Sequence, residues 1–421
     1  MEAQIMSIYR IGTNTTNENS MYHLTTREYM MDKVHNQIST GKKHRLPSES
    51  PVDVTQAMTF HSKKFKIEQL ERNINDLSSE RMLAESKMSS TIDMLQRVRE
   101  LAVQGANGIY NEENRLAMSQ EVDQVLRNLI LEANSKYKGN YLFSGHQKYT
   151  KPFEVIEGAV KGADSAMITE VHYLGDSGKH LREIDFNEYA SAVPAGSELF
   201  WAEQFEIHSK VNTADFRLEQ DTAIMIDGVR IDFQSGDNIY AVMDKINKSD
   251  AAVNASVDIT DGGLIIKSTH PHRIEMADIE GGNLLQNLGV IEEGFPYGAN
   301  NYSKDADVFG GSIFDVLIGL RDAMIQNNPE DIGGRYLGAL DDAVNNITFH
   351  QAKTGALQNR LDYLSARLGD DKAAYTETMS KLEDVDMAKA LTDLSALDFA
   401  HKAALSGLAK ITKTSLMDFL R

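Results

Sequence analysis

The chain contains no cysteine among its 421 residues. This absence excludes a disulfide framework, thiol catalysis and cysteine-ligated zinc, and it fits both reducing and oxidising surroundings. Aromatic residues make up 7% of the chain and include a single tryptophan, which suits a helical bundle better than a large enzyme-type core. No run of residues approaches the roughly twenty apolar positions of a membrane-spanning helix. We therefore expect no membrane partner and no chemistry based on cysteine.

Positive charge is also scarce, because 62 acidic residues outnumber 43 lysines and arginines and leave a net charge of -19. Binding to nucleic acid requires clustered basic residues that neutralise phosphates, and the run from Lys42 to Arg45 is too short for that. Residues 1–19 lack the apolar segment and the small-residue cleavage site of a secretory signal peptide. We expect no nucleic-acid partner and, if the protein is exported, a route without such a peptide.

Long apolar stripes with helical spacing run through roughly the first 140 and the last 100 residues. One stripe extends from Ile67 to Val98, interrupted by Arg81, and another extends from Leu382 to Ile411. An isolated helix cannot bury a stripe of this width, so each stripe needs a helix from the same chain or from a neighbouring subunit. The pattern predicts that the two ends of the chain fold against each other and extrude the middle.

The middle of the chain, from about Thr150 to about Lys304, carries short strand-like runs instead. Asp227-Gly228 predicts a hairpin, because both residues tolerate the positive φ of a tight turn between two apolar runs. A short helix is predicted over 239–247, and strands are predicted at 171–173 and 199–201. These signals indicate a β-rich region with a core of its own, which we expect to fold alone.

The fold class expected from these patterns is α+β, with a long antiparallel helical bundle or coiled coil formed by both termini and an inserted β-rich outer domain. Gly369 suggests a break before the final helix. The terminal arms are expected to be disordered in the monomer, because their stripes have no neighbour there. The expected division is 1–45 for the N-terminal axial arm, 46–149 for the N-terminal helical part, 150–305 for the outer domain, 306–384 for the C-terminal helical part, and 385–421 for the C-terminal axial arm.

Several groups of residues are similar to functional sites without completing one. His270 and His272 could be two metal ligands, but no third ligand is evident, so a solvated loop is the preferred interpretation. Glycine pairs fit turns better than phosphate-binding loops, and no nucleophile elbow or catalytic triad occurs. We expect no catalytic residue, no metal ion and no cofactor. A surface hairpin is also preferred over a calcium loop for four acidic residues without the required spacing, Asp258, Asp261, Asp278 and Glu280.

Residues 38–43 near the start of the chain contain a Ser-Thr-Gly element, and residues 46–52 form a proline-containing bend. Both resemble elements of the bacterial flagellin family, with Glu49 in place of an aspartate. Residues 101–108 with Asn114-Arg115 resemble the segment that joins the two N-terminal helices. In the same way, 246–257 resembles a hairpin module of several axial proteins, and 355–361 and 383–388 resemble the shared C-terminal arm.

Residues 141–145 and 415–420 resemble the hook-filament junction members of the family more than its filament-forming members. The resemblance implies a structural protein without catalysis, located in the flagellum and therefore extracellular, or periplasmic if the flagella are enclosed. Its implied partners are further copies of itself, hook-associated protein 1, flagellin and an export chaperone, and it would be exported unfolded. The apolar stripe of the last helix would supply the seam between subunits, formed by Leu391, Leu394, Leu397, Leu408, Ile411, Leu416 and Phe419.

Three other classes stay open. A filament-forming flagellin would have the same arms, and long filaments made by this protein alone would favour it. A coiled-coil sensor domain would show similar repeats, but it needs a membrane anchor or a partner domain that the sequence does not show. An enzyme carried on the filament would need a convergent polar site in residues 150–305, where the sequence shows none.

Overall fold

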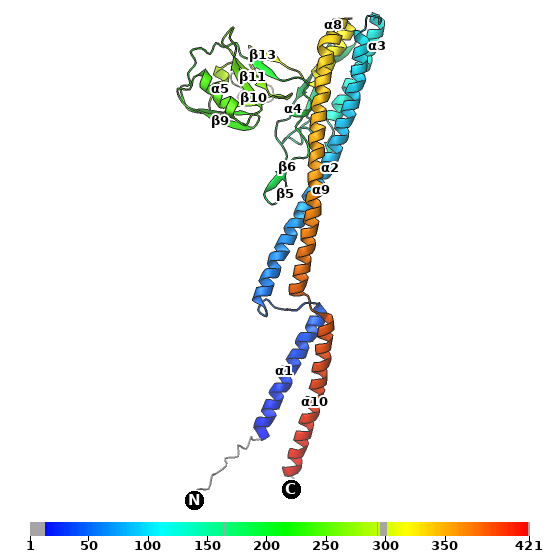
Figure 1. Cartoon of the computed structure of the whole chain (residues 1–421), viewed down its shortest axis with the longest axis vertical. Helices are drawn as coiled ribbons and strands as arrows, with labels where there is room; N and C mark the ends of the chain where they lie inside the picture. The colour runs from blue at the N-terminus through cyan, green and yellow to red at the C-terminus, as the bar shows by residue number, and fades with distance from the viewer. Residues whose placement is uncertain (1–12, 164, 293, 295–300, 420–421) are drawn as a thin grey trace. The chain divides into compact units, whose positions relative to one another are not determined.

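The computed structural model describes residues 13–163, 165–292, 294 and 301–419, with side chains described from Glu18 to Ala409 within these ranges. It has the expected α+β class, with long helices from both ends of the chain and small antiparallel sheets from the middle (Figure 1). The residues up to Gln69 and those from Ala366 onward form one compact unit, and Leu70–Ser365 form a second. The helices α2 (Pro51–Ala106) and α9 (Leu337–Glu383) contribute to both units.

The first unit contains α1 (Thr13–Thr40) and α10 (Met387–Phe419), which pack against each other. Gly41 ends α1 with a φ of 72°, and Pro51 opens α2, so the predicted proline bend is confirmed. The short connections at the ends of these helices pair with each other. The backbone N–H of Lys43 donates to the Glu383 carbonyl over 2.6 Å, and that of Val385 donates to the Gly41 carbonyl over 2.9 Å.

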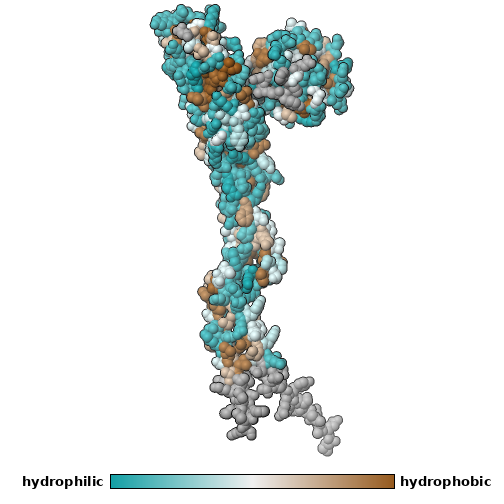
Figure 2. All heavy atoms as spheres, turned by 180° about the vertical axis from the view of Figure 1, so that it is seen from behind, coloured by the Kyte–Doolittle hydropathy of each residue, from teal (hydrophilic) through white to brown (hydrophobic). Residues whose placement is uncertain are grey.

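The second unit contains a helical bundle built from α2, α3 (Glu112–Ala133), α7 (Ile313–Ile325) and α9, with α8 (Pro329–Asp331) and a π-helical turn (Ile332–Tyr336) before α9. The Asn111 side chain caps the start of α3, because it accepts a hydrogen bond from the Asn114 N–H. On the face shown in Figure 2, most of the bundle surface is hydrophilic. The stripe predicted on α2 is buried across both units at Ile67, Leu70, Ile74, Leu77, Ala84, Met88, Leu95 and Val98.

The predicted helix break at Gly369 is wrong, because α9 runs through this residue without interruption. A single glycine in a helix interior costs only about 1 kcal/mol relative to alanine. The buried side chains of Leu361, Leu364 and Leu368 on the same helix supply packing that outweighs this cost. The helix ends instead at Glu383, just before Asp384-Val385-Asp386.

All strand pairs of the middle region are antiparallel. The strands are β1 (Lys136–Tyr137), β2 (Asn140–Tyr141), β3 (Phe153–Ala159), β4 (Ala166–Tyr173), β5 (Arg182–Asp185), β6 (Glu188–Ala190), β7 (Glu206–His208), β8 (Thr222–Ile226), β9 (Val229–Phe233), β10 (Val253–Val257), β11 (Leu264–Ser268), β12 (Met276–Ile279) and β13 (Asp307–Phe309). One sheet has the order β10-β11-β7-β13, another has β12-β8-β9, and three hairpins stand apart as β1-β2, β3-β4 and β5-β6. The short helices here are α4 (Gly196–Leu199), α5 (Ile239–Lys248) and α6 (Leu284–Asn287).

The predicted hairpin at Asp227-Gly228 is confirmed, with φ values of 49° and 77° and with Ile226 paired to Val229. The predicted helix that begins at Ile239 is confirmed as α5. The strand predicted at 199–201 is wrong, because α4 ends at Leu199 and Trp201 forms only an isolated bridge with Ser312. Three consecutive apolar residues carry no alternation, so periodicity cannot separate a strand from a buried turn.

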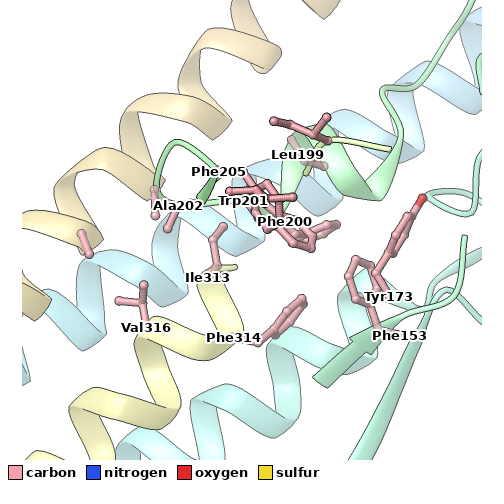
Figure 3. Close-up of a cluster of buried hydrophobic side chains, with 14 of the residues drawn as sticks. Phe153, Tyr173, Leu199, Phe200, Trp201, Ala202, Phe205, Ile313, Phe314 and Val316 are labelled. Carbon is pink, nitrogen blue, oxygen red and sulfur yellow. The ribbon is translucent and has the colours of Figure 1, made fainter. Parts of the chain in front are cut away.

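A cluster of aromatic rings connects the middle region to the bundle (Figure 3). The ring of Phe153 lies 4.9 Å from that of Phe314 on α7 and 5.2 Å from that of Phe200, measured between centroids. Phe143, which follows β2, contacts Phe200 in the same cluster. Residues 150–305 therefore do not have a private core as a whole, contrary to the expectation, because their first part shares its core with the helices.

A smaller domain can be defined from the point at which the chain enters and leaves the two larger sheets. The backbone N–H groups of Ala202 and Glu203 both donate to the Gly311 carbonyl, at 3.0 and 3.3 Å, so the entering and leaving segments are joined there. Strand β13, which lies beyond residue 305, also pairs with β7. We define the outer domain by this boundary, as residues 203–311.

We expect a fragment of residues 203–311 to fold alone and to melt cooperatively. It keeps both larger sheets and α5, whose Ile239, Val242 and Ile246 are buried. A fragment of residues 150–305 should contain the same core but leave 150–202 without protection, since Phe143 and Phe314 are missing from it. Circular dichroism with amide hydrogen exchange checks both fragments. Strong protection of β3 and β4 in the fragment 150–305 would contradict the shared core.

Candidate assembly surface on the terminal helices

His270 and His272 do not form an open metal site. Their rings stack with centroids 4.4 Å apart, and His272 is only 4% exposed. Its Nε2 lies 3.0 Å from Asp227 Oδ2 and its Nδ1 lies 2.9 Å from the His270 carbonyl oxygen, so both ring nitrogens face acceptors. No group of three potential ligands occurs in the part of the chain that the structure describes. The interpretation as a solvated loop is wrong for His272, because the hairpin turn at Asp227 covers it.

A histidine that donates from both nitrogens carries a positive charge. Burial of the His272 ring lowers its pKa, but the hydrogen bond and the charge of Asp227 raise it more, so the pKa lies above its ordinary value. Because the folded state holds this proton more tightly than the unfolded state, the pair stabilises the fold fully below the unfolded pKa. That stabilisation is lost as the pH rises through the raised folded pKa.

We therefore expect the outer domain to lose stability as the pH rises from about 6 through the raised pKa of His272, with a loss of about 1–3 kcal/mol. In His272→Gln, which stays neutral, this part of the pH dependence should disappear. Denaturant unfolding of the fragment 203–311 at several pH values measures the effect. His208→Gln, which changes a partly exposed histidine next to Glu206, serves as the matched control. An identical pH dependence in His272→Gln and in the unchanged fragment would contradict the assignment.

The four acidic residues considered for calcium do not form one cluster either. Asp258 and Asp261 accept hydrogen bonds from the N–H groups of Thr260 and Gly263 within a turn, as a surface hairpin predicts. Glu280 pairs with Arg230. Asp278 departs from the prediction, because it is buried in β12 and accepts hydrogen bonds from two N–H groups of α6; its burial raises its pKa.

The helices α1 and α10 face each other along stripes with alternating steps of three and four residues. An antiparallel register is fixed by the Arg27 Nη1 bond to the Ala400 carbonyl, at 2.9 Å, and by the bridge between Lys42 and Asp384. The less exposed positions include these two stripes: Ser20, Leu24, Arg27, Met31, Val34 and Ile38 on α1, and Ala390, Leu394, Leu397, His401, Ala404 and Leu408 on α10. In this register each position of one stripe stands opposite one position of the other, as in an antiparallel coiled coil.

Very little of this helix pair is buried. In the described side chains of α1 and α10, only Leu24 and Ala390 are buried, at 9% and 4% exposure. Two long helices with so little buried apolar surface are marginal on their own, since most helical stability in proteins comes from packing. The pair therefore needs further helices against it.

Large apolar side chains also point away from the partner helix. Brown apolar patches are visible on the described arms in Figure 2, next to the residues drawn in grey. Exposed apolar patches on a protein surface mark interaction sites. We call this set the outward face; its exposed fractions run from 45% to 77%, and its members are Met21, Tyr22, Tyr29, Met30, Met387, Leu391, Phe399 and Leu405.

The structure distributes the expected seam residues over two surfaces. Leu394, Leu397 and Leu408 are half-buried in the stripe that faces α1, whereas Leu391 is exposed on the outward face. Ile411, Leu416 and Phe419 lie beyond the last described side chain. The sequence interpretation missed the other residues of the outward face. A signal for part of it was present, because Met387 and Leu405 recur at helical spacing from Leu391.

We expect the amides of α10 from Leu391 to Ala409 to exchange rapidly with solvent in the monomer, because the α1–α10 pair buries so little. In assembled material the same amides should be protected at least about a hundredfold more, as packing stabilises the helices. Amide hydrogen exchange on both samples checks this, with α7 as the internal reference for a buried helix. Strong protection of Leu391 to Ala409 in the monomer would show that the pair is stable without neighbours.

Within the described ranges, none of the helices combines the length and the apolar character that crossing a bilayer requires.

Family models match both ends of the chain and part of its middle. Residues 11–148 match the bacterial flagellin N-terminal helical region, and residues 337–420 match the bacterial flagellin C-terminal helical region. Residues 216–270, inside the outer domain, match the flagellin hook IN motif. The two helical regions include α1, α2, α3, α9 and α10 and together extend over more than half of the chain.

Flagellins of Vibrio species match 80–95% of the chain at low identity. Flagellin C of Vibrio cholerae is 24% identical over 402 residues, which cover 95% of this chain and 96% of the relative. Polar flagellin B/D of Vibrio parahaemolyticus is 26% identical over 347 residues, covering 80% of this chain and 79% of the relative. Among solved structures, flagellar hook associated protein-3 from Legionella pneumophila has a TM-score of 0.47 and 18% identity, covering 77% of this chain and 98% of that one.

Proposed function

Because this chain belongs to the bacterial flagellin family, and is thus a structural component of the flagellum and not an enzyme, we propose that it forms the junction between hook and filament. In this role its paired ends would pack side by side with those of neighbouring subunits into the axial tube. The β-rich outer domain would lie outside the tube and take no part in this packing.

The observation that carries the proposal is the incomplete burial of the α1–α10 pair. The stripes along which α1 and α10 face each other join the two ends of one chain. The outward face presents eight large apolar side chains. Each such side chain contributes about 1.5–3 kcal/mol when it is removed completely from water. Neighbouring subunits that cover the outward face would therefore supply the stability that the isolated pair lacks.

The junction role, rather than the filament role, is supported by the resemblance of residues 141–145 and 415–420 to junction proteins. In the structure the first of these segments ties the middle region to the bundle. Phe143 is fully buried, and its carbonyl accepts hydrogen bonds from the Tyr173 hydroxyl at 3.0 Å and from the Gly196 N–H at 2.9 Å. The alternative is a filament-forming flagellin, which the similarity to flagellins along nearly the whole chain favours.

The neighbours that fit this proposal are hook-associated protein 1 below, flagellin above and further copies of the chain beside it. An export chaperone would cover the outward face before assembly, since exposed apolar surface of this size promotes aggregation. Export would place the protein outside the cell, or in the periplasm if the flagella are enclosed.

Immunogold labelling of isolated flagella tests the proposal. We expect gold particles at a single position between hook and filament, and we expect cells that lack the protein to carry hooks without attached filaments. Labelling along the whole filament would establish the filament-forming alternative instead. Unlabelled flagella and normal filaments in the deletion strain would contradict both roles.

A further inference from the structure

A cavity of about 390 Å³ lies on the flank of α9 in the second unit. One wall is α9 itself, including Ala356 and Leu357, and the other is the end of β6 with the segment that follows it, from Tyr189 to Pro194. Its walls are mainly apolar, but Lys179, Lys353 and Arg360 line it against a single carboxylate, that of Glu198. In a chain with a net charge of -19, this cavity is a local cationic site.

Two of its residues carry a polar group that has no partner among the described residues. His350, which is 3% exposed, has a buried Nε2 without a hydrogen-bond partner among the described residues, and its burial lowers its pKa to about 4, so the ring is neutral. Lys353 makes no ion pair with any described residue, whereas Lys179 pairs with Glu198 and Arg360 pairs with Glu188. An apolar hollow with an unpaired cation at its rim fits an apolar side chain flanked by carboxylates.

Such a group lies at one end of the same bundle, where α2 turns into α3 (Figure 1). Ile109 in this turn is 86% exposed. Glu112 and Glu113 lie in the first turn of α3, and Glu330 and Asp331 lie in α8; none of the four makes an ion pair with a described residue. Carboxylates are ordinary in the first turn of a helix, but the helix dipole does not account for the exposed isoleucine.

This end of the bundle, which we call the acidic tip, is held together by hydrogen bonds of one arginine. The buried Arg115 donates to the carbonyls of Gly105 and Asn107, at 2.8 and 3.0 Å, and to Asn327 Oδ1 at 2.6 Å. It thus holds the turn between α2 and α3 together with the turn before α8. A protrusion that is already ordered loses little entropy on binding, which favours a specific contact.

We propose that the acidic tip of one copy of this chain inserts Ile109 into the cavity on α9 of a second copy, with Glu112 and Glu113 against Lys353 and Arg360. The two surfaces are complementary in charge and both have an apolar part, and they are different parts of one chain. A contact between different surfaces of identical subunits is heterologous and can propagate along an axis instead of ending in a closed pair. The inference rests on the self-association in the proposed function and names a contact for it.

Cysteine cross-linking tests the contact directly, because the natural chain has no cysteine. Full-length Ile109→Cys and full-length Ala356→Cys are mixed, allowed to associate and oxidised with diamide. We expect a disulfide-linked dimer in the mixture, and about tenfold less of it with either variant alone, since a disulfide needs Cα atoms within roughly 7 Å. Ile109→Cys mixed with Gln120→Cys, which is exposed on α3, is the matched control and should not cross-link.

An exchange of charges tests the specificity. Lys353→Glu in the Ala356→Cys chain, or Glu113→Lys in the Ile109→Cys chain, should each lower the cross-linking yield about tenfold, because like charges then meet. Mixing the two altered chains should restore most of the yield. Melting curves of each variant ensure that a loss does not come from unfolding.

Three outcomes would overturn the inference: no cross-link although the chains associate in sedimentation, equal cross-linking of Ile109→Cys with itself, or no restoration by the charge exchange. None of them bears on the hook-filament position, which the gold labelling decides separately. A protein found at the junction without this cross-link would keep the proposed function and lose the tip-to-cavity contact.

Discussion

Replacing Phe153 by alanine should be the most damaging single change to the stability of this protein. Its ring is almost fully buried and contacts those of Tyr173, Phe200 and Phe314, with centroids 4.9 to 5.2 Å apart. Removing a buried phenylalanine side chain costs about 3–5 kcal/mol, because apolar burial is lost and a cavity remains. We therefore expect the free energy of unfolding of the second unit to fall by that amount.

Denaturant unfolding of the full-length chain, followed by circular dichroism, measures this loss. The matched control is Phe349→Ala, which removes a phenylalanine that is 60% exposed on α9 and should change the stability by less than about 0.5 kcal/mol. If the two variants are equally stable, the aromatic cluster does not hold β3 and β4 to the bundle. The shared core inferred above would then be wrong.

Placing two aspartates on the outward face should abolish incorporation into the flagellum while leaving the monomer intact. Leu391 and Leu405 are 51% and 46% exposed, so Leu391→Asp with Leu405→Asp removes little packing from the free chain. In the assembly, burying an unpaired carboxylate costs several kcal/mol per group. We expect incorporation to fall at least about a hundredfold, with the melting temperature of the monomer unchanged.

Quantitative labelling of isolated flagella measures incorporation. Thr392→Asp with Ser395→Asp places the same two charges on α10 at polar positions and is the matched control. A second comparison uses Leu394→Asp, in the stripe that faces α1, which should open the α1–α10 pair and expose amides in the monomer. If the outward pair and the inner residue gave the same monomer exchange pattern, the distinction between the two surfaces of α10 would fail.

Local sequence signals were sufficient to predict the long helices and the tight turn at Asp227-Gly228. The buried side chains of α2 follow the spacing read from the sequence, and Asp227-Gly228 adopts the positive φ values that its chemistry allows. These features depend on residues close together in the chain. The uninterrupted course of α9 through Gly369 depends on packing by other helices. The presence of a single glycine in the sequence does not predict that packing.

The candidate surface was only partly predictable for a related reason. An apolar stripe shows that one side of a helix is covered, but it does not show whether its own chain or another subunit covers it. Leu394 and Leu391 are three residues apart, and both belong to the stripe read from the sequence. Only the register between α1 and α10 separates the inner residue from the outward one. The aromatic cluster was missed because Phe143, Phe153, Phe200 and Phe314 meet only in the folded chain.

The pairing of α1 with α10 has a consequence for how the protein is produced. The two helices lie at opposite ends of the described chain, so α1 has no partner unless the whole sequence between them and α10 itself are present. Contacts between such distant segments form late, because the intervening loop must first be closed. A copy cut short by incomplete translation or by proteolysis would lack one half of the pair and could not present a finished outward face. We therefore expect truncated copies to be excluded from the growing structure.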